Sequence, residues 1–121
     1  VIETGFSLDE CRAAVGKSMS LAPRPTALFC SNDLLAVGAI AGLKSLGLRT
    51  PEDVSVVGFD DTSMASHVSP ALTTVRQPVY DMGWRGATLL IDTVEGQLKT
   101  PAYELLPLTM VVRESVAGTE L

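Results

Sequence analysis

The sequence TALFCSNDLLAVG, residues 26–38, and the sequence VSVVGFDD, residues 54–61, decide the fold. Each begins with a short apolar run and then turns polar, at Asn32-Asp33 in the first and at Asp60-Asp61 in the second. A short continuous apolar run is typical of a strand buried on both faces, as in a parallel sheet. The two stretches therefore predict two such strands, each ending in a polar cluster.

The chain between and around these strands is helical in pattern. Residues 34–46 carry apolar side chains at helical spacing, and Gly47 follows as a typical residue just past a helix end. Upstream, Ser7 and Glu10 have the spacing of a capping box, which predicts a helix over residues 8–19. The order helix, strand, helix, strand with short connections is that of consecutive parallel strands joined by crossovers. The sequence thus predicts an α/β fold with a doubly wound parallel sheet.

The second half of the chain predicts further elements. Pro78 suits the first turn of a helix, and apolar residues at helical spacing predict the buried stripe of that helix up to about residue 95. Its stripe consists of Val79, Met82, Gly86, Leu90 and Val94. The other expected elements are a short helical piece over residues 63–67, a strand over 72–76, and one or two closing strands over 105–108 and 109–112.

The composition excludes several classes of function. The chain has 121 residues, 46% hydrophobic and 19% charged, which describes a globular protein with a core. Its net charge is −5 and its nine Lys and Arg residues are scattered, so we expect that this chain does not bind nucleic acid directly. No apolar run approaches the roughly 20 residues that span a bilayer, and the first residues do not resemble a signal peptide. Cys11 and Cys30 lack metal-type spacing, so we expect two reduced, partly buried thiols in a cytoplasmic protein.

The polar clusters at the strand ends are the candidate binding site. In open parallel sheets, ligands bind beyond the carboxyl ends of the strands, where Asn32-Asp33 and Asp60-Asp61 lie together. Gln77 ends the later strand and joins them. Amides donate and accept while carboxylates accept hydroxyl protons, so the set suits a sugar, another polyol or a nucleobase. The competing interpretation is that Asp33 or Asp61 merely caps a helix.

Catalytic and cofactor sites have weaker support. His67 is the single histidine and is expected at the surface, and no G-x-S-x-G elbow accompanies it. No glycine-rich phosphate loop and no metal-ligand cluster is present in the sequence, so we expect no cofactor and no metal. An enzyme with Asp60 or Asp61 as nucleophile remains an alternative, but it would need a Lys at the same sheet edge. We therefore predict a protein that is not an enzyme.

Several blocks of the sequence resemble the LacI/GalR family of bacterial transcriptional repressors. They run in family order, as residues 25–38, 47–61, 70–78 and 112–115. The resemblance implies the C-terminal part of a periplasmic-binding-protein-like type I effector domain. It implies ligand contacts at Asn32, Asp60 and Gln77, with structural roles for Asp33 and Asp61. It further implies a homodimer, with Val37, His67 and Val68 at the interface.

The resemblance also sets the expected domain organisation. Residues 1–121 would form a single partial effector-binding and dimerisation domain, without the DNA-binding headpiece and the N-terminal subdomain of a complete repressor. Operator DNA would then be contacted only through that headpiece, under control of a small sugar-like or purine-like effector. The helix over residues 79–95 would lack its usual partner, so the isolated chain is expected to oligomerise. The alternative of the same fold is a periplasmic sugar-binding protein of a transporter.

Overall fold

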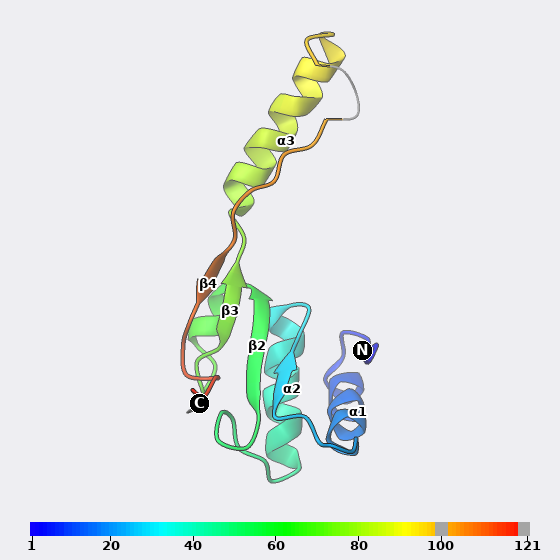
Figure 1. Ribbon diagram of the computed structural model, residues 1–121, viewed down its shortest axis with the longest axis vertical. Coiled ribbons are helices and arrows are strands. Elements are labelled where there is room, and N and C mark those ends of the chain that lie inside the picture. The colour runs from blue at the N-terminus through cyan, green and yellow to red at the C-terminus, as the bar shows by residue number, and fades with distance from the viewer. Residues whose placement is uncertain (99–101, 119–121) are drawn as a thin grey trace. The chain divides into compact units, whose positions relative to one another are not determined.

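The computed structural model describes residues 1–98 and 102–118 (Figure 1). The chain divides into two compact units. Unit 1 comprises residues 1–76 and the chain from residue 110 onward, and unit 2 comprises residues 77–109. Unit 1 contains the sheet and the polar strand ends.

Unit 1 is built on an open α/β sheet. Its elements are α1 (Leu8–Met19), β1 (Ala27–Phe29), α2 (Asp33–Ser45), β2 (Ser55–Asp60), the 3-10 helix η1 (Ser63–Ser66), β3 (Thr73–Arg76) and β4 (Thr109–Val111), the last beginning at the edge of unit 2. The strands stand in the order β1, β2, β3, β4, and both β1–β2 and β2–β3 are parallel pairs, which confirms the predicted parallel sheet. The helix α2 packs against β2 and the helix α1 packs against α2.

The predicted capping box starts α1. The Ser7 side chain accepts a hydrogen bond from the backbone N–H of Glu10, and the Glu10 carboxylate accepts one from the backbone N–H of Ser7. Two N–H groups that the helix leaves unpaired are thereby satisfied. These bonds also hold the pKa of Glu10 below its ordinary value, through the Ser7 side chain first and its backbone second. The prediction of this helix is confirmed in type and position.

The core lies between the helices and one face of the sheet. Val56 of β2 and Leu43 of α2 are fully buried there, together with Leu72 before β3. Gly58 belongs to the same face, and a side chain at that position would meet Asp33 Oδ1 at 2.5 Å and Leu72 Cδ2 at 2.9 Å. The close approach of α2 to β2 therefore depends on the missing side chain.

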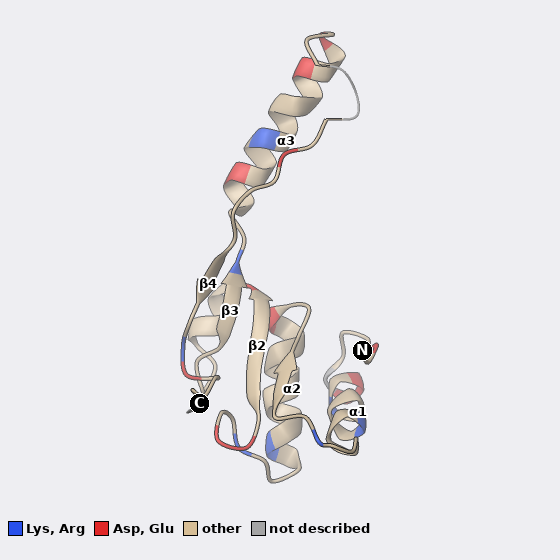
Figure 2. Ribbon diagram, in the orientation of Figure 1, with Lys and Arg blue, Asp and Glu red and all other residues tan. Residues whose placement is uncertain are grey.

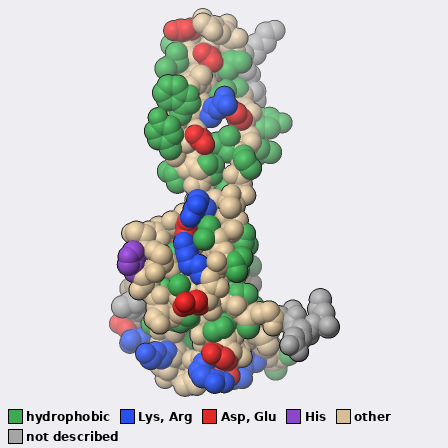
Figure 3. Space-filling model, turned by 90° about the vertical axis from the view of Figure 1, so that its left-hand side faces the viewer, with side chains coloured by type: hydrophobic (Ala, Val, Ile, Leu, Met, Phe, Trp, Pro, Cys, Tyr) green, Lys and Arg blue, Asp and Glu red, His purple; other side chains and the backbone are tan. Residues whose placement is uncertain are grey.

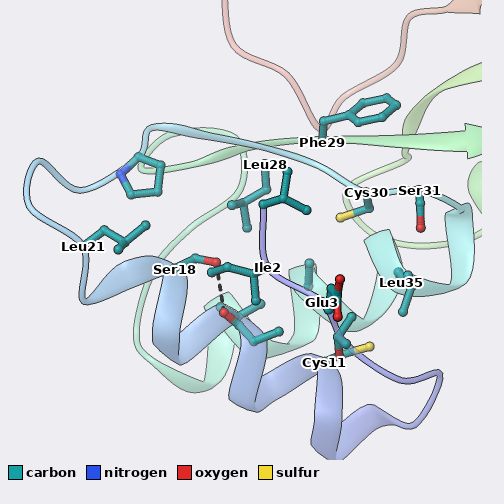
Figure 4. Close-up of a pocket in the computed structure, with 16 residues that line it drawn as sticks. Ile2, Glu3, Cys11, Ser18, Leu21, Leu28, Phe29, Cys30, Ser31 and Leu35 are labelled. Atoms are coloured by element: carbon teal, nitrogen blue, oxygen red, sulfur yellow. Dashed lines mark hydrogen bonds between the residues drawn. The ribbon is translucent and has the colours of Figure 1, made fainter.

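The prediction that β1 is buried on both faces is wrong. Figure 4 shows Leu28 directed toward the helices and Phe29 directed away from them. Phe29 is 67% exposed, and its ring meets that of Phe59 edge to face with centroids 6.5 Å apart. β1 is at the end of the strand order, so fewer neighbours cover it than cover β2. An apolar run therefore identified the strand correctly but overestimated its burial.

Only one closing strand forms where one or two were predicted. Residues 109–111 form β4, whereas residues 105–108 are outside any strand. Pro107 lacks the N–H that a strand ladder needs, which explains the interruption. Leu105 is accordingly exposed.

Unit 2 consists of α3 (Val79–Val94) and the segment that follows it. The helix forms as predicted, and no residue of it is buried within the described chain, as expected for an apolar stripe that lacks its usual partner. One helix and a returning segment, tied by an ion pair between Arg85 and Glu104 at 3.6 Å, provide too few side chains to cover it. Figure 3 shows hydrophobic side chains on the surface of this unit. They include Val79, Tyr80, Met82, Trp84, Leu90, Ile91 and Val94.

Candidate functional site

The strand register brings Asn32 and Asp60 to the same edge of the sheet. Phe29 of β1 stands opposite Val57 of the parallel strand β2. Asn32 and Asp60 each follow this pair by three positions. Because the two strands are parallel, both residues lie toward the same end of the sheet. The predicted juxtaposition of the two strand ends is confirmed.

Asn32 has a structural role at the start of α2. It is the N-cap of α2, with extended backbone (φ −156°, ψ 170°), and its Oδ1 accepts a hydrogen bond of 2.8 Å from the backbone N–H of Leu35. This cap fixes the orientation of the amide plane. The Asn32 amide nitrogen carries two further N–H donors, which a ligand oxygen can accept.

Asp33 does not cap the helix, which corrects that alternative. Its carboxylate is 1% exposed and accepts hydrogen bonds from the Thr62 backbone N–H at 2.6 Å, the Thr62 hydroxyl at 2.9 Å and the Thr74 hydroxyl at 2.6 Å. Three donors compensate a buried charge that would otherwise be costly. Asp33 therefore ties the start of α2 to the chain after Asp60 and to β3.

The turn at Asp60 and Asp61 has an unusual backbone. Both residues have positive φ, 109° and 54°, a region that side-chain-bearing residues rarely adopt. Such strain persists only where surrounding contacts fix it, and it is concentrated at functional sites. The Asp60 side chain is half-buried at the end of β2.

Asp61 is held by two arginines and caps no helix. Its side chain is 6% exposed and accepts hydrogen bonds from Arg76 Nε at 2.6 Å and from Arg113 Nη2 at 2.7 Å. Burial alone would raise the pKa of Asp61, but the hydrogen bonds from Arg113 and Arg76 outweigh it and hold that pKa below its ordinary value. Asp61 is thus a fixed anion, engaged by the protein itself.

Gln77 follows the strand that pairs with β2. Arg76, the last residue of β3, stands opposite Asp60, and Gln77 comes next as the first residue of unit 2. Gln77 is half-buried. By register, the chain therefore leaves unit 1 at the same sheet edge that carries Asn32 and Asp60.

The residues expected at a dimer interface come from neighbouring elements. Val37 is on α2, and His67 and Val68 follow η1, which contacts α2. The two valines are half-buried, while His67 is exposed, with its Nδ1 2.7 Å from the Ser63 carbonyl oxygen and 3.2 Å from the Ser66 hydroxyl.

The sequence did not identify several residues that build this edge. Thr62 and Thr74 bind Asp33, and Arg113 binds Asp61, across 29, 41 and 52 positions of the chain respectively. Ser115 is also buried, and its hydroxyl accepts from the Thr73 N–H at 2.8 Å and donates to the Val56 carbonyl at 2.6 Å. Of the residues that the sequence did not identify, only Thr74 lies within a strand, where a polar side chain was a signal that the sequence offered.

A separate cavity of about 620 Å³ lies between α1, α2, β1 and residues 1–4 (Figure 4). Its walls include Val15, Leu28 and Ala39 with both cysteines, but neither Asn32 nor Asp60. Burial, and secondarily the electrostatic interaction with Cys11, raises the pKa of Cys30 to about 11. Burial, and secondarily Glu10, raises that of Cys11. Both thiols are free and stay protonated near neutral pH, as packing groups.

The surface charges provide no other obvious site. Figure 2 shows acidic and basic residues interspersed along the ribbon of unit 1. Within residues 1–98 and 102–118, no cluster of His, Cys, Asp and Glu has the arrangement of a metal site. Over that same part of the chain, no helix has the length and apolar character to cross a membrane.

Comparison with known proteins identifies the family. The periplasmic binding protein-like domain family matches residues 3–116. The HTH-type transcriptional repressor PurR of Vibrio vulnificus is 38% identical over 117 residues, 96% of this chain and 35% of the repressor. The HTH-type transcriptional regulator CelR of Thermobifida fusca is 39% identical over 110 residues, 91% of this chain and 32% of the regulator. The chain thus spans about a third of the length of these relatives.

Solved structures agree with the sequence relatives. A CelR–cellobiose complex superposes with a TM-score of 0.83 at 38% identity, covering 93% of this chain and 34% of that one. A LacI family regulator from Enterococcus faecalis V583 with bound ribose superposes with a TM-score of 0.82 at 36% identity, covering 96% of this chain and 43% of that one. The fold, the family match and these relatives agree: the chain belongs to the LacI family of transcriptional regulators, within their periplasmic binding protein-like domain.

Proposed function

We propose that this chain is part of the effector-binding domain of a LacI-type transcriptional repressor and contacts a small sugar-like or purine-like molecule. The observation that carries the proposal is the position of Asn32 and Asp60, each three residues after the paired residues Phe29 and Val57 of two parallel strands. The relatives support a polar effector, since CelR is solved with cellobiose and the Enterococcus faecalis regulator with ribose. They are transcriptional regulators, which favours a repressor over a transporter's binding protein or an enzyme.

Each candidate contact has a defined chemical role. The Asp60 carboxylate accepts hydrogen bonds from two neighbouring hydroxyls, or from N–H groups of a base. The Asn32 amide nitrogen donates to a ligand oxygen while its Oδ1 stays on the helix cap. Gln77, at the start of the crossover, adds an amide with both properties. Hydrogen bonds to a charged group contribute about 1.5–3 kcal/mol each, so Asp60 is the strongest single determinant.

In the complete protein, we propose that a second subdomain and a DNA-binding headpiece accompany residues 1–121. Two copies would associate through Val37, His67 and Val68, and the headpieces of the dimer would bind operator DNA in the cytoplasm. An effector that binds one subdomain arrangement better than another shifts the population toward it. By linkage, the same free-energy difference changes the affinity for DNA.

A thermal-shift screen of the full-length protein tests this function. The probes are cellobiose, ribose, adenine and guanine. A ligand that binds only the folded protein raises the melting temperature by mass action, and Asp60→Ala should abolish that rise. Glu52→Ala, an exposed acidic residue just before β2, is the matched control and should keep it. A ligand-induced shift that survives in Asp60→Ala would refute the assignment of Asp60.

A further inference from the structure

Arg113 connects the end of the chain to the turn after β2. Its Nη2 donates to Asp61 Oδ1 at 2.7 Å and its Nη1 donates to the Leu72 carbonyl at 2.8 Å. Its backbone N–H donates to the Thr73 hydroxyl at 2.8 Å. The Arg113 side chain is only 19% exposed. The guanidinium plane is therefore fixed by two acceptors at once, which a planar fork does well and a single ammonium does not.

The strained turn is held at both of the residues that follow Asp60. Asp61 is bound by Arg113 and by Arg76, and Thr62 is bound by the buried carboxylate of Asp33. Asp60 itself belongs to the ladder of β2, opposite Arg76. With ladder contacts before it and two anchored residues after it, the backbone of Asp60 keeps its φ of 109°.

Of the two arginines, Arg113 has the stronger hold on Asp61. The Arg76 side chain is 57% exposed, so solvent screens its ion pair. Arg113 is mostly removed from solvent, and its second hydrogen bond, to Leu72, limits its alternative positions. The lowered pKa of Asp61 agrees with a carboxylate that keeps its charge between these partners.

We propose that Arg113 is a positioning residue for effector recognition: it holds Asp61 and so fixes the turn that presents the Asp60 carboxylate at the sheet edge. The link to the effector rests on the function proposed above, whereas the link to the turn does not. Arg113 need not touch the ligand. Its loss should loosen a few residues around Asp60 and leave the rest of unit 1 intact.

The test is hydrogen exchange of backbone amides in the full-length protein without ligand. In Arg113→Met, exchange of the amides at Asp61 and Thr62 should accelerate by about tenfold or more, because local opening no longer breaks the Asp61 ion pair. Amides of α1 should exchange as in the wild type. Arg113→Lys keeps the charge without the fork and should give an intermediate rate at the same two amides. If Arg113→Met does not fold, Asp61→Asn takes its place in the experiment.

Arg49→Met is the matched control. Arg49 also pairs with an aspartate, Asp53 at 3.2 Å, but it is 70% exposed and precedes β2. Its loss should leave the exchange of Asp61 and Thr62 unchanged. The proposal is overturned if Arg113→Met leaves these two amides unchanged, or if it accelerates exchange uniformly through α1 and α2, since uniform loss means a general contribution to stability.

Ligand binding gives the functional consequence. For whichever of cellobiose, ribose, adenine and guanine binds the wild type, Arg113→Met should weaken binding about tenfold or more, and Arg49→Met should not. Unchanged affinity in Arg113→Met overturns the positioning of Asp60. If none of the four probes binds the wild type, the proposed function fails for these ligands, while the exchange rates still decide whether Arg113 holds the turn.

Discussion

The backbone N–H of Thr62 donates a hydrogen bond of 2.6 Å to the carboxylate of Asp33. Asp33 directly follows Asn32 and opens α2, while Thr62 comes two residues after Asp60. A hydrogen bond to a buried carboxylate therefore joins the two strand ends that carry the candidate ligand contacts. The spacing of Asn32 and Asp60 is consequently a property of the core as much as of the sheet.

Replacement of Asp33 should be among the most damaging changes in unit 1. Asp33→Ala leaves the Thr62 N–H and the Thr62 and Thr74 hydroxyls without their buried acceptor. We expect a loss of about 3 kcal/mol or more in the free energy of unfolding, measured by urea denaturation of the full-length protein. Asp9→Ala is the control, since that side chain is almost fully exposed and makes only a 3.8 Å ion pair. Equal stability of the two variants would contradict this account of Asp33.

A side chain at Gly58 should be destabilising, because β2 and α2 are in close contact there. An added side chain would lie 2.5 Å from Asp33 Oδ1 and 3.3 Å from Ala36 Cβ, so Gly58→Ala should force α2 away from the sheet. We expect a destabilisation of about 1–3 kcal/mol, read as a lowered denaturation midpoint. Gly16→Ala in α1 meets nothing within 4 Å and should instead stabilise the protein by up to about 1 kcal/mol. If Gly58→Ala left the stability unchanged, the packing between α2 and β2 would have to be loose enough to accept a side chain.

Ser115 completes the sheet with its side chain. The hydroxyl accepts from the N–H of Thr73 and donates to the carbonyl of Val56, so it bridges β2 and the start of β3. Ser115→Ala should lower the free energy of unfolding by about 1–3 kcal/mol, because two buried polar groups lose their partner. Thermal denaturation of Ser115→Ala measures this loss. Ser66→Ala, at an exposed position, is the control. Matching melting temperatures would contradict a bridging role for Ser115.

Asp61 gives the protein a dependence of stability on acid pH. Because its pKa in the folded state is depressed, its contribution is fully present above its unfolded pKa, about 4, and is lost as pH falls through the lower folded value. The stability difference between wild type and Asp61→Asn should thus be constant near neutrality and shrink below about pH 4. Urea denaturation at a series of pH values measures it. If the stability difference between wild type and Asp61→Asn grew as the pH fell, the pKa of Asp61 could not be depressed by folding.

Asn32 allows the cap to be separated from the binding site. Asn32→Ser keeps a side-chain oxygen for the Leu35 N–H but removes the amide donors. The free energy of unfolding of the variant should therefore stay within about 1 kcal/mol of the wild-type value. Its affinity for the effector should fall, because the amide donors are lost. Calorimetric titration of the full-length protein measures that affinity. Retained affinity would show that Asn32 serves the helix alone.

Periodicity and strand-end polarity were sufficient to predict the elements of unit 1. Apolar runs located β1 and β2, the capping box located α1, and the parallel order placed Asn32 and Asp60 at one edge. These features are local, or follow from the direction of successive strands.

What sequence reasoning missed depends on long-range contacts. Nothing local to Thr62 or Arg113 shows that they bind carboxylates 29 and 52 positions away. Burial was misjudged for a related reason: the run containing Phe29 identifies a strand but not the number of layers that cover it. The stripe of α3 likewise indicates a helix without indicating its partner.

The decisive experiment on the Asn32 and Asp60 site is a crystal structure of the full-length protein with a bound ligand. The ligand is whichever of cellobiose, ribose, adenine and guanine gives the largest thermal shift. We expect one ligand molecule with polar atoms about 3 Å from both the Asn32 amide nitrogen and the Asp60 carboxylate. A ligand seated in the cavity between α1, α2 and β1, or one that contacts neither residue, would contradict it.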